Sequence, residues 1–268
     1  MTGTEPAVSR IDTSRPHPAR VYDWFLGGKD NYPVDEELGR QITAMQGDAP
    51  RHARANRRFM ERATRAVVRE TGIRQFLDIG SGIPTEPNLH QIAQSVVPDA
   101  RVVYVDNDPI VLAHAAALLR GTPEGATEYV QADAREPERI LEQAAAVLDL
   151  DRPVALSLIA LLHFIADDDG AHQLVDTLVD ALAPGSCLVL SALTADFDPE
   201  NVDRGIAAYR ASGVTLVARS HTEMGRFFKG LALLEPGIAS LSDWRPSADE
   251  HDAHKEPVSL YGAVGFKR

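Results

Sequence analysis

The chain has 268 residues, of which 44% are hydrophobic and 25% charged, an ordinary balance for a globular protein. Its formal net charge of −12 disfavours nucleic acid as a partner, because neutralising phosphates requires surplus Lys and Arg. The one cysteine, Cys187, excludes an internal disulfide, and no hydrophobic run reaches the roughly 18 residues of a membrane-spanning helix. The N-terminus lacks the apolar region of a secretory signal, so we expect a cytoplasmic protein with no membrane partner.

Charge divides the chain into two regions. Residues 1–75 carry 13 Lys and Arg against 10 Asp and Glu, whereas residues 76–268 carry 14 against 29. The hydrophobic pattern changes at the same place. We therefore expect a helical N-terminal cap or lid over residues 1–72 and a larger domain over residues 73–268.

The N-terminal region mixes irregular and helical sequence. Residues 1–20 are rich in Pro, Ser, Thr and Arg and show no periodicity, so we expect them to lie along the surface or to stay mobile until a contact holds them. Residues 21–47 place aromatic side chains beside two adjacent glycines. Residues 51–70 carry apolar side chains at helical spacing, which predicts an amphipathic helix. The arginines on its other face are interpreted as a solvated surface, with a local nucleic-acid contact as the alternative.

From residue 74 onward, short apolar runs alternate with helical segments. The runs predict strands at residues 74–80, 101–106, 127–133, 152–164, 186–194 and 257–268. The helical segments fall at residues 87–97, 110–120, 137–148 and 171–185, with further helix within 199–229. This alternation predicts a parallel sheet covered by helices on both faces. Runs such as VVYV and CLVL lack polar alternation, which is typical of strands buried on both faces.

Polar elements follow three successive predicted strands. Gly80 and Gly82 follow the first strand, Asp106 ends the second, and Asp133 follows the third. Glycines let a backbone approach a ligand closely, and a carboxylate after the second strand can accept hydrogen bonds from a ribose diol. Because ligands bind beyond the carboxyl ends of parallel strands, these elements predict one binding crevice. Taken alone, each Asp is also explained as a helix cap.

The run Asp78-Ile79-Gly80-Ser81-Gly82, together with Asp106 and Asp133, resembles the class I S-adenosylmethionine-dependent methyltransferases. The resemblance implies an α/β fold of the Rossmann-like type in three layers (α/β/α), in addition to the N-terminal helical cap. Its sheet would be seven-stranded and mostly parallel, with a reversed last strand. The implied cofactor is S-adenosylmethionine, and the implied contacts are Gly80, Ser81, Gly82, Asp106, Asn107, Asp133 and Ala134.

Further blocks resemble an actinobacterial family called S-adenosyl methyltransferase, formerly a domain of unknown function. They are ARVYDWFLGGKDNYPVD at 19–35, NRRF at 56–59, RQFLDIGSGIPT at 74–85, YVDNDPIVLAHA at 104–115 and LLHF at 161–164. This resemblance extends over nearly the whole chain. It implies cofactor binding and does not name a methyl acceptor.

Four further residues complete the candidate site. His163, at the end of the fourth predicted strand, and Tyr22 are candidate catalytic residues, because a neutral imidazole can take a proton from a substrate hydroxyl. Packing against the cofactor is the alternative for His163, and a purely structural lid is the alternative for Tyr22. Asn31 is a candidate cofactor contact. Arg57 is a candidate partner for the cofactor carboxylate, because Pro84 stands where many family members have a third glycine; a surface arginine is the alternative.

The acidic run Asp167–Asp169 is the most metal-like feature of the sequence. We interpret it as the N-terminal cap of the following helix, which the helix dipole favours. No His or carboxylate pair stands at metal-ligand spacing, so we predict no metal.

Two classes of function remain open. The first is a methyltransferase that acts on an unidentified, small-molecule acceptor. The alternative is a non-catalytic regulatory protein that binds S-adenosylmethionine or its demethylated product. A nicotinamide-dependent oxidoreductase is disfavoured by the incomplete GxGxxG pattern and by Asp133. The sequence indicates no oligomeric state.

Overall fold

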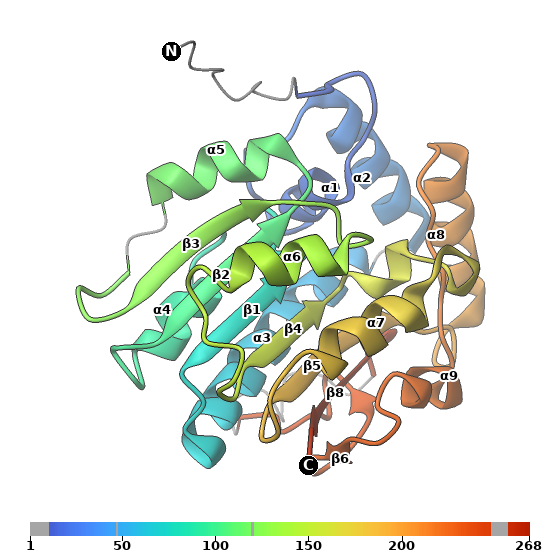
Figure 1. Cartoon of the computed structure of the whole chain (residues 1–268). Helices are drawn as coiled ribbons and strands as arrows, with labels where there is room; N and C mark the ends of the chain where they lie inside the picture. Colours follow the sequence, from blue (N-terminus) through green and yellow to red (C-terminus); the bar gives the residue numbers. More distant parts are fainter. Residues whose placement is uncertain (1–10, 47, 119–120, 248–256) are drawn as a thin grey trace, which may run out of the picture.

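An eight-stranded sheet forms the centre of the described structure (Figure 1). The computed structural model describes residues 11–46, 48–118, 121–247 and 257–268. The strands are β1 (Gln75–Ile79), β2 (Arg101–Asp106), β3 (Ala126–Gln131), β4 (Ala155–Ile159), β5 (Cys187–Leu193), β6 (Ala232–Leu233), β7 (Ala239–Ser240) and β8 (Leu260–Phe266). Their order is β3-β2-β1-β4-β5-β8-β6, and β7 pairs with β8. Strands β1 to β5 run parallel, and β8 runs antiparallel to β5.

The sheet confirms the predicted α/β fold with a reversed last strand. It differs from the expected seven strands at one edge, where β6 and β7, of two residues each, both pair with β8. Pro236 and Gly237 lie between them. Proline has no N–H to donate to a neighbouring strand, and Gly237 has a φ of +84°, which an extended strand does not contain. The edge strand is therefore divided into two short pieces.

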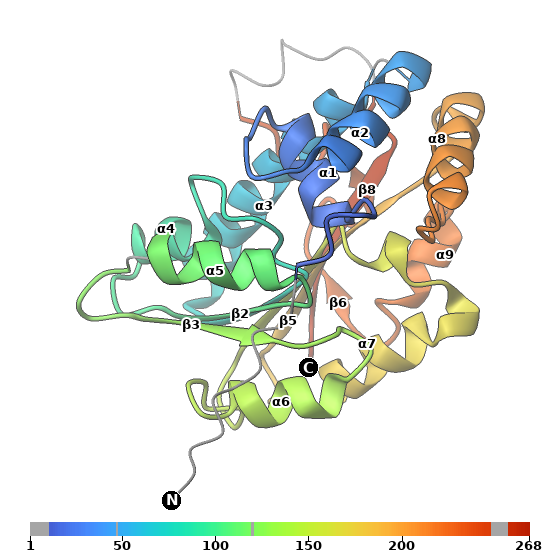
Figure 2. The same ribbon diagram turned by 90° about the horizontal axis from the view of Figure 1, so that it is seen from above.

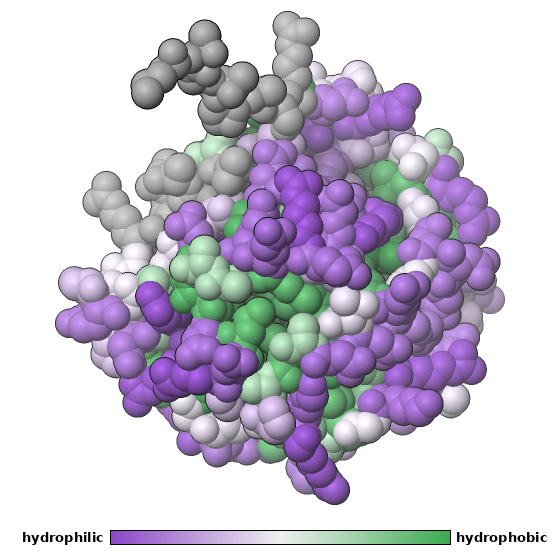
Figure 3. All heavy atoms as spheres, in the orientation of Figure 1, coloured by the Kyte–Doolittle hydropathy of each residue, from purple (hydrophilic) through white to green (hydrophobic). Residues whose placement is uncertain are grey.

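Helices cover both faces of the sheet. They are α1 (Pro18–Phe25), α2 (Pro33–Gln46), α3 (Ala49–Thr71), α4 (Leu89–Gln94), α5 (Pro109–Leu118), α6 (Pro137–Ala144), α7 (Ala171–Asp180), α8 (Pro199–Ala211) and α9 (His221–Arg226), with the 3-10 turns η1 (Leu162–Phe164) and η2 (Asp167–Asp169). Figure 2 shows α3, α4 and α5 on one face and α6 and α7 on the other, which confirms the predicted three layers. In the view of Figure 3 the surface is mostly hydrophilic, with a hydrophobic area near its centre. None of the described helices is long and apolar enough to cross a membrane.

The central strands are buried on both faces, as their apolar sequences predict. All residues of β2 except the first are buried. Side chains alternate along β1: Leu77 and Ile79 pack in the core beneath α6 and α7, whereas Phe76 packs in the core beneath α3 and α4. Each face of the sheet therefore has its own hydrophobic core.

Helix α3 packs on the sheet through the apolar face that its sequence predicts. Phe59, Ala63 and Val67 are buried in one cluster with Phe76 and Trp244. The helix ends at Gly72, which adopts a left-handed φ of +71° and donates its N–H to the last turn. Helix α3 thus shares the core of the sheet, and the proposed division into residues 1–72 and 73–268 stays a prediction.

The predicted strand over residues 152–164 is too long. Strand β4 ends at Ile159, because Ala160 adopts a left-handed φ of +56° and the chain then turns into η1. The apolar run continues through Leu161 and Leu162, so the hydrophobic pattern alone did not mark this end. His163 therefore lies in η1 and does not end the fourth strand.

The acidic run Asp167–Asp169 is not the helix cap that the sequence predicted. It forms η2, and the N-cap residue of α7 is Gly170, which makes no side-chain cap bond. The carboxylate of Asp167 instead accepts hydrogen bonds from the buried guanidinium of Arg219. Asp167 therefore holds the loop after β4 in place, and the run does not cap α7.

Candidate active site

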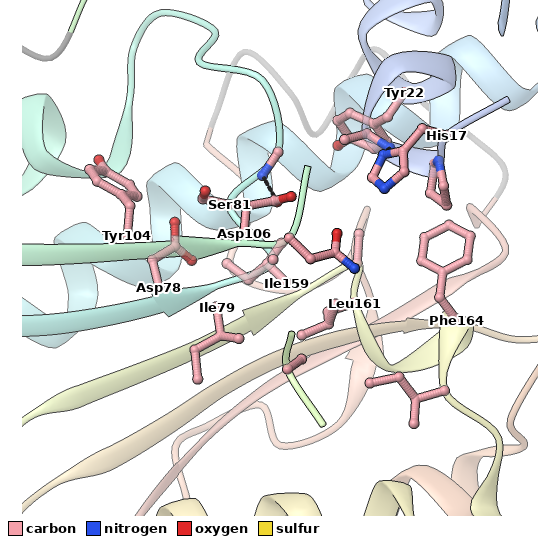
Figure 4. A pocket seen from close by; sticks show the side chains of 18 of the residues that line it. His17, Tyr22, Asp78, Ile79, Ser81, Tyr104, Asp106, Ile159, Leu161 and Phe164 are labelled. Atoms are coloured by element: carbon pink, nitrogen blue, oxygen red, sulfur yellow. Dashed lines mark hydrogen bonds between the residues drawn. The ribbon is translucent and has the colours of Figure 1, made fainter. Parts of the chain in front are cut away.

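A cavity of about 420 Å³ opens at the carboxyl ends of the parallel strands. This volume falls within the roughly 300–1,000 Å³ of small-molecule sites. Figure 4 shows Asp78, Ser81 and Asp106 on one side of the cavity and His17, Tyr22 and Phe164 on the other. The predicted site residues that line the cavity are Tyr22, Arg57, Gly80, Ser81, Gly82, Asp106, Asn107, Asp133 and Ala134. The structure brings all of the predicted site residues together there except Asn31 and His163.

Two glycines in the left-handed region shape the turn after β1. Gly80 has a φ of +75° and Gly82 a φ of +67°, which side chains rarely allow. A Cβ on Gly80 would lie 2.7 Å from Leu161 Cδ1, so the turn passes close to the segment after β4. The N–H groups of Gly80 and Ser81 donate to Val105 O, which ties the turn to β2. The turn therefore packs closely against the segment after β4 on one side and against β2 on the other.

Asp106, the last residue of β2, is a buried carboxylate at the wall of the cavity. Its Oδ2 accepts the N–H of Gly82 at 2.8 Å (Figure 4). Its Oδ1 accepts the N–H of Asp108 at 3.0 Å. Burial raises the pKa of Asp106 above its usual value. A carboxylate has about four acceptor sites, and the backbone uses two. The remaining capacity suits a pair of hydroxyl donors in the cavity.

Asp133 and Ala134 follow β3 at the same edge of the sheet. Asp133 is half-buried and accepts hydrogen bonds from the Arg135 N–H at 2.9 Å and from the Arg135 guanidinium at 3.2 Å. These bonds orient the carboxylate and leave acceptor capacity for a further donor. Ala134 is buried, and Asn107 lines the cavity after Asp106.

The cavity also contains Asp78 of β1 and Tyr104 of β2, which the sequence analysis did not assign to the site. Burial raises the pKa of Asp78 to about 6, an effect that Ser157 and Arg57 partly oppose. The hydroxyl of Tyr104 accepts the N–H of His90 at 2.8 Å. Asp78 is the first residue of the glycine-rich motif, so the motif itself contained the signal for it.

Arg57 of α3 reaches the loop after β1. Its Nη2 donates to the carbonyl oxygens of Thr85 and Pro87. Within the described part of the chain, its Nε and Nη1 groups have no hydrogen-bond partner. Because Arg57 also lines the cavity, these donors are available to an anionic group bound there.

The N-terminal segment forms the opposite wall and is anchored by a buried ion cluster. Arg20 Nε donates to Asp108 Oδ2 at 3.0 Å, and His17 Nδ1 lies 3.2 Å from the same oxygen. Asp35 Oδ2 lies 3.6 Å from Arg20 Nη1, and Asp35 Oδ1 accepts the N–H of His17 at 2.8 Å. The cluster fixes the segment before α1 against the loop that follows Asp106.

Tyr22 belongs to a chain of hydrogen bonds at the cavity wall. Its hydroxyl donates to Ala53 O and accepts from Asn56 Nδ2, both at 3.0 Å. Asn56 Oδ1 accepts the hydroxyl of Ser191 at 2.6 Å, and Ser191 Oγ accepts the N–H of Ala160 at 3.0 Å. Burial raises the pKa of Tyr22 above its usual value. The phenol is therefore neutral with its proton engaged, which favours positioning over proton transfer.

Asn31 lies away from the cavity. Its Nδ2 donates to Asp23 Oδ2 at 2.8 Å and to Gly28 O at 3.1 Å. Asp23 Oδ2 also accepts the N–H of Asp30 at 3.0 Å. The polar side chains of this stretch thus close the turn between α1 and α2. Asn31 takes part in that turn and does not line the cavity.

His163 is buried in η1 and lines a second, smaller cavity beside the first. Its Nδ1 accepts the N–H of Leu193 at 3.3 Å, and its ring lies edge-on to Phe164 at 4.4 Å between centroids. Burial, reinforced by the charge of Arg219, lowers the pKa of His163 to about 3. The imidazole is neutral at physiological pH and is a weak base.

Sequence reasoning missed residues that tertiary packing brings to the cavity. His17, Asn56, Ala160 and Phe164 are among them. Asn56 had a signal, because it is a polar residue on the apolar face of the predicted helix, where it is 3% exposed. In the residues that the structure describes, no group of three His, Cys, Asp or Glu side chains is placed to hold a metal ion.

The sheet order, the reversed strand and the strand-end cavity define the Rossmann-like methyltransferase class of α/β proteins. The chain belongs to the S-adenosyl methyltransferase family, whose family model matches residues 4–268.

Solved structures support the same assignment. A DUF574 family protein from Streptomyces avermitilis is 49% identical, with a TM-score of 0.94, covering 97% of this chain and 100% of that chain. A protein from Thermobifida fusca that is described as a methyltransferase is 37% identical, with a TM-score of 0.85 and 98% of both chains covered. An S-adenosylmethionine-dependent methyltransferase from Mesorhizobium loti is similar in fold, at 19% identity and a TM-score of 0.51 over 77% of this chain and 96% of that chain. A comparison with curated proteins finds no match.

The predicted family, activity and cofactor are therefore confirmed. The chain is an S-adenosylmethionine-dependent methyltransferase, and S-adenosylmethionine is its cofactor.

Proposed function

We propose that S-adenosylmethionine occupies the 420 Å³ cavity and that a small-molecule acceptor receives the methyl group beside Tyr22 and Phe164. The adenosine part contacts Asp106 and the residues that follow β2 and β3, which are Asn107, Asp133 and Ala134. The methionine part lies along the turn formed by Gly80, Ser81 and Gly82, where the backbone approaches most closely.

The buried carboxylate of Asp106 is the observation that carries this proposal. Both of its oxygens are held by backbone N–H groups, of Gly82 and Asp108, so its orientation is fixed before a ligand arrives. Its free acceptor sites match the two donors of a ribose diol. The acceptor sites of Asp106 therefore fit the ribose of the family's cofactor.

Arg57 is the proposed partner of the cofactor carboxylate. Pro84 removes a backbone N–H from the turn, and the unpartnered Nε and Nη1 groups of Arg57 supply replacement donors among the described residues.

When bound, the cofactor supplies a methyl group that its sulfonium already activates. The residues of this chain contribute alignment and exclusion of water, which can account for much of the rate of such a transfer. The hydrogen-bonded chain through Tyr22, Asn56 and Ser191 holds the wall in one position. We assign Tyr22 and His163 to the positioning of the acceptor, because neither side chain is poised as a base.

A cytoplasmic setting in an actinobacterium is part of the proposal. The single buried cysteine accords with a reducing compartment, and the solved relatives of 49% and 37% identity come from Streptomyces and Thermobifida. The net charge of −12 supports a small molecule over a nucleic acid as acceptor.

Calorimetric titration of the wild type and Asp106→Ala with S-adenosylmethionine and S-adenosylhomocysteine tests the site. We expect the variant to bind both at least about tenfold more weakly, because it loses hydrogen bonds to a charged group. The matched control is Asp176→Ala, which removes an exposed carboxylate of α7 and should leave both affinities unchanged.

Thermal melting of each variant separates loss of binding from loss of fold. Equal affinity of Asp106→Ala and wild type would contradict the ribose role of Asp106. Stabilisation of the wild type by NAD in place of S-adenosylmethionine would contradict the assignment of the cavity as a whole.

A further inference from the structure

A second cavity of about 90 Å³ lies against the wall of the first. Pro18, Tyr22, Asn56, Ala160 and Phe164 line both cavities, so the two share one partition. The partition includes the hydrogen-bonded chain from Ala160 through Asn56 to Tyr22. A molecule that enters the small cavity therefore ends next to the proposed cofactor site.

The lining of the small cavity is apolar and carries no formal charge. Its apolar lining residues include Phe25, Ile42, Val202, Leu216 and Leu260. Among the residues that the structure describes, none that lines this cavity is Asp, Glu, Lys or Arg. A cation placed there would lose its hydration with no carboxylate to replace it, which is strongly unfavourable.

Two histidines are among the polar residues of the cavity, which also include Tyr22, Asn56 and Tyr209. The N–H of Leu193 donates to His163 Nδ1 at 3.3 Å, and the N–H of Ser259 donates to His52 Nε2 at 3.4 Å. A nitrogen that accepts a hydrogen bond carries no proton, so the proton of each neutral ring resides on the other nitrogen. Burial lowers the pKa of both histidines, which keeps them neutral. Each ring therefore carries one N–H donor, on Nε2 of His163 and on Nδ1 of His52, and both residues line the mostly apolar cavity.

Volume limits what the cavity accepts. An engineered apolar cavity that binds benzene measures about 150 Å³, whereas this one measures about 90 Å³. A ring that enters the small cavity must therefore extend past the shared lining toward the larger cavity. Phe164 and Tyr209 add aromatic surface, with ring centroids 5.9 Å apart at an angle of 61°. These features favour a flat aromatic group.

We propose that the methyl acceptor is a non-cationic aromatic molecule whose ring enters the cavity between His52 and His163 and whose oxygen accepts a hydrogen bond from the His163 Nε2–H. The group to be methylated then lies at the partition, beside Tyr22 and Asn56. This inference rests on the proposed function, because it places the acceptor relative to the S-adenosylmethionine site.

Three probes of similar size test the inference on protein saturated with S-adenosylhomocysteine. They are acetophenone, ethylbenzene, which lacks the oxygen, and benzylammonium, which is a cation. Binding is followed by ligand-observed NMR. We expect acetophenone to bind most tightly and benzylammonium at least about tenfold more weakly, because of the uncompensated loss of hydration.

Two variants locate the binding. Val202→Phe fills the cavity from α8 and should abolish binding of acetophenone and ethylbenzene, whereas Ala207→Phe on an exposed position of the same helix should not. His163→Asn keeps an acceptor for the Leu193 N–H and removes the Nε2 donor. It should weaken acetophenone about tenfold and ethylbenzene less than about twofold.

Unchanged binding of acetophenone to Val202→Phe, equal effects of His163→Asn on both neutral probes, or tighter binding of benzylammonium would each overturn the inference. Affinity for S-adenosylhomocysteine, measured on every protein, separates the two proposals. A wild type that binds no S-adenosylhomocysteine contradicts the proposed function, whereas one that binds it and excludes the neutral ring probes contradicts this inference alone.

Discussion

Asp78 makes the floor of the cavity sensitive to pH. Burial raises its pKa to about 6, compared with an ordinary value of 3.8. Between these two values the unfolded chain has lost the proton while the folded chain keeps it. The folded state therefore loses stability as the pH rises through this window, and the effect levels off above about pH 6.

Asp78→Asn removes this pH-dependent penalty. We expect the variant to gain about 1–2 kcal/mol relative to the wild type between about pH 4 and pH 7. The whole shift of the Asp78 pKa would correspond to a change of about 3 kcal/mol in the free energy of unfolding. The expected gain is smaller, because Asp78 borders an open cavity whose solvent screens its charge. Urea unfolding at the two pH values measures the change, with Asp176→Asn on the exposed face of α7 as the control. A difference between variant and wild type that is the same at both pH values would contradict the assignment.

A single site residue can be predicted from the sequence when neighbouring residues in the chain determine its position. Gly80, Gly82 and Asp106 were predicted, because each stands directly after or at the end of a strand and the strand places it at the carboxyl edge. His17, directly before α1, and Asn56, in α3, reach the same cavity over contacts far apart in the sequence. A single sequence contains no direct record of such contacts.

At the scale of elements, the segment before and within α1 acts as a clamped wall. Arg20 is 3% exposed and lies between the carboxylates of Asp108 and Asp35. Removing one partner of a buried ion cluster leaves the others uncompensated. Arg20 therefore links this wall to the loop after Asp106 and to α2.

Arg20→Ala should destabilise the protein by about 3–5 kcal/mol and weaken S-adenosylmethionine binding. Denaturant unfolding and calorimetry measure the two effects. Arg40→Ala on α2 is the matched control, because Arg40 is exposed and its pairs with Glu36 and Glu37 lie at the surface. Its expected cost is below about 1 kcal/mol. Similar costs for the two variants would show that the buried cluster does not anchor the wall.

The ends of strands and helices are harder to predict from the sequence pattern than the elements themselves. The strands and helices of the sheet were predicted from apolar runs and helical spacing, because tertiary packing agrees with the local preference there. The end of β4 was not, because Ala160 carries the left-handed turn that Gly or Asn usually marks. The position of His163 and the lining of the small cavity follow from that turn and could not be predicted.

At the scale of the whole molecule, helix α3 from the N-terminal part of the chain packs closely on strand β8 from the C-terminal part. A Cβ on Gly262 of β8 would lie 2.4 Å from Leu241 Cδ2 and 2.8 Å from Phe59 Cε2. The absence of a side chain there lets α3 lie directly on the reversed strand.

Gly262→Ala should therefore destabilise the protein by about 1–3 kcal/mol, because the added methyl group forces α3 and the Leu241 loop apart. Gly225→Ala on α9 is the control: its Cβ would meet Ile238 at 3.6 Å, an ordinary contact, and alanine favours the helix. Urea unfolding compares them. A Gly262→Ala protein as stable as the wild type would indicate that the contact can relax without cost.

The reversed strand has a practical consequence for attaching reporters. Phe266 near the end of β8 pairs with Cys187 at the start of β5, so the C-terminus lies at the end of the sheet opposite the cavity. Lys267 secures it there by donating to the carbonyl oxygens of Val179, Asp180 and Leu182 at the end of α7. A fluorescent label attached after Arg268 would lie away from the cavity. A surface tether attached there would leave the ligand entrance facing solution.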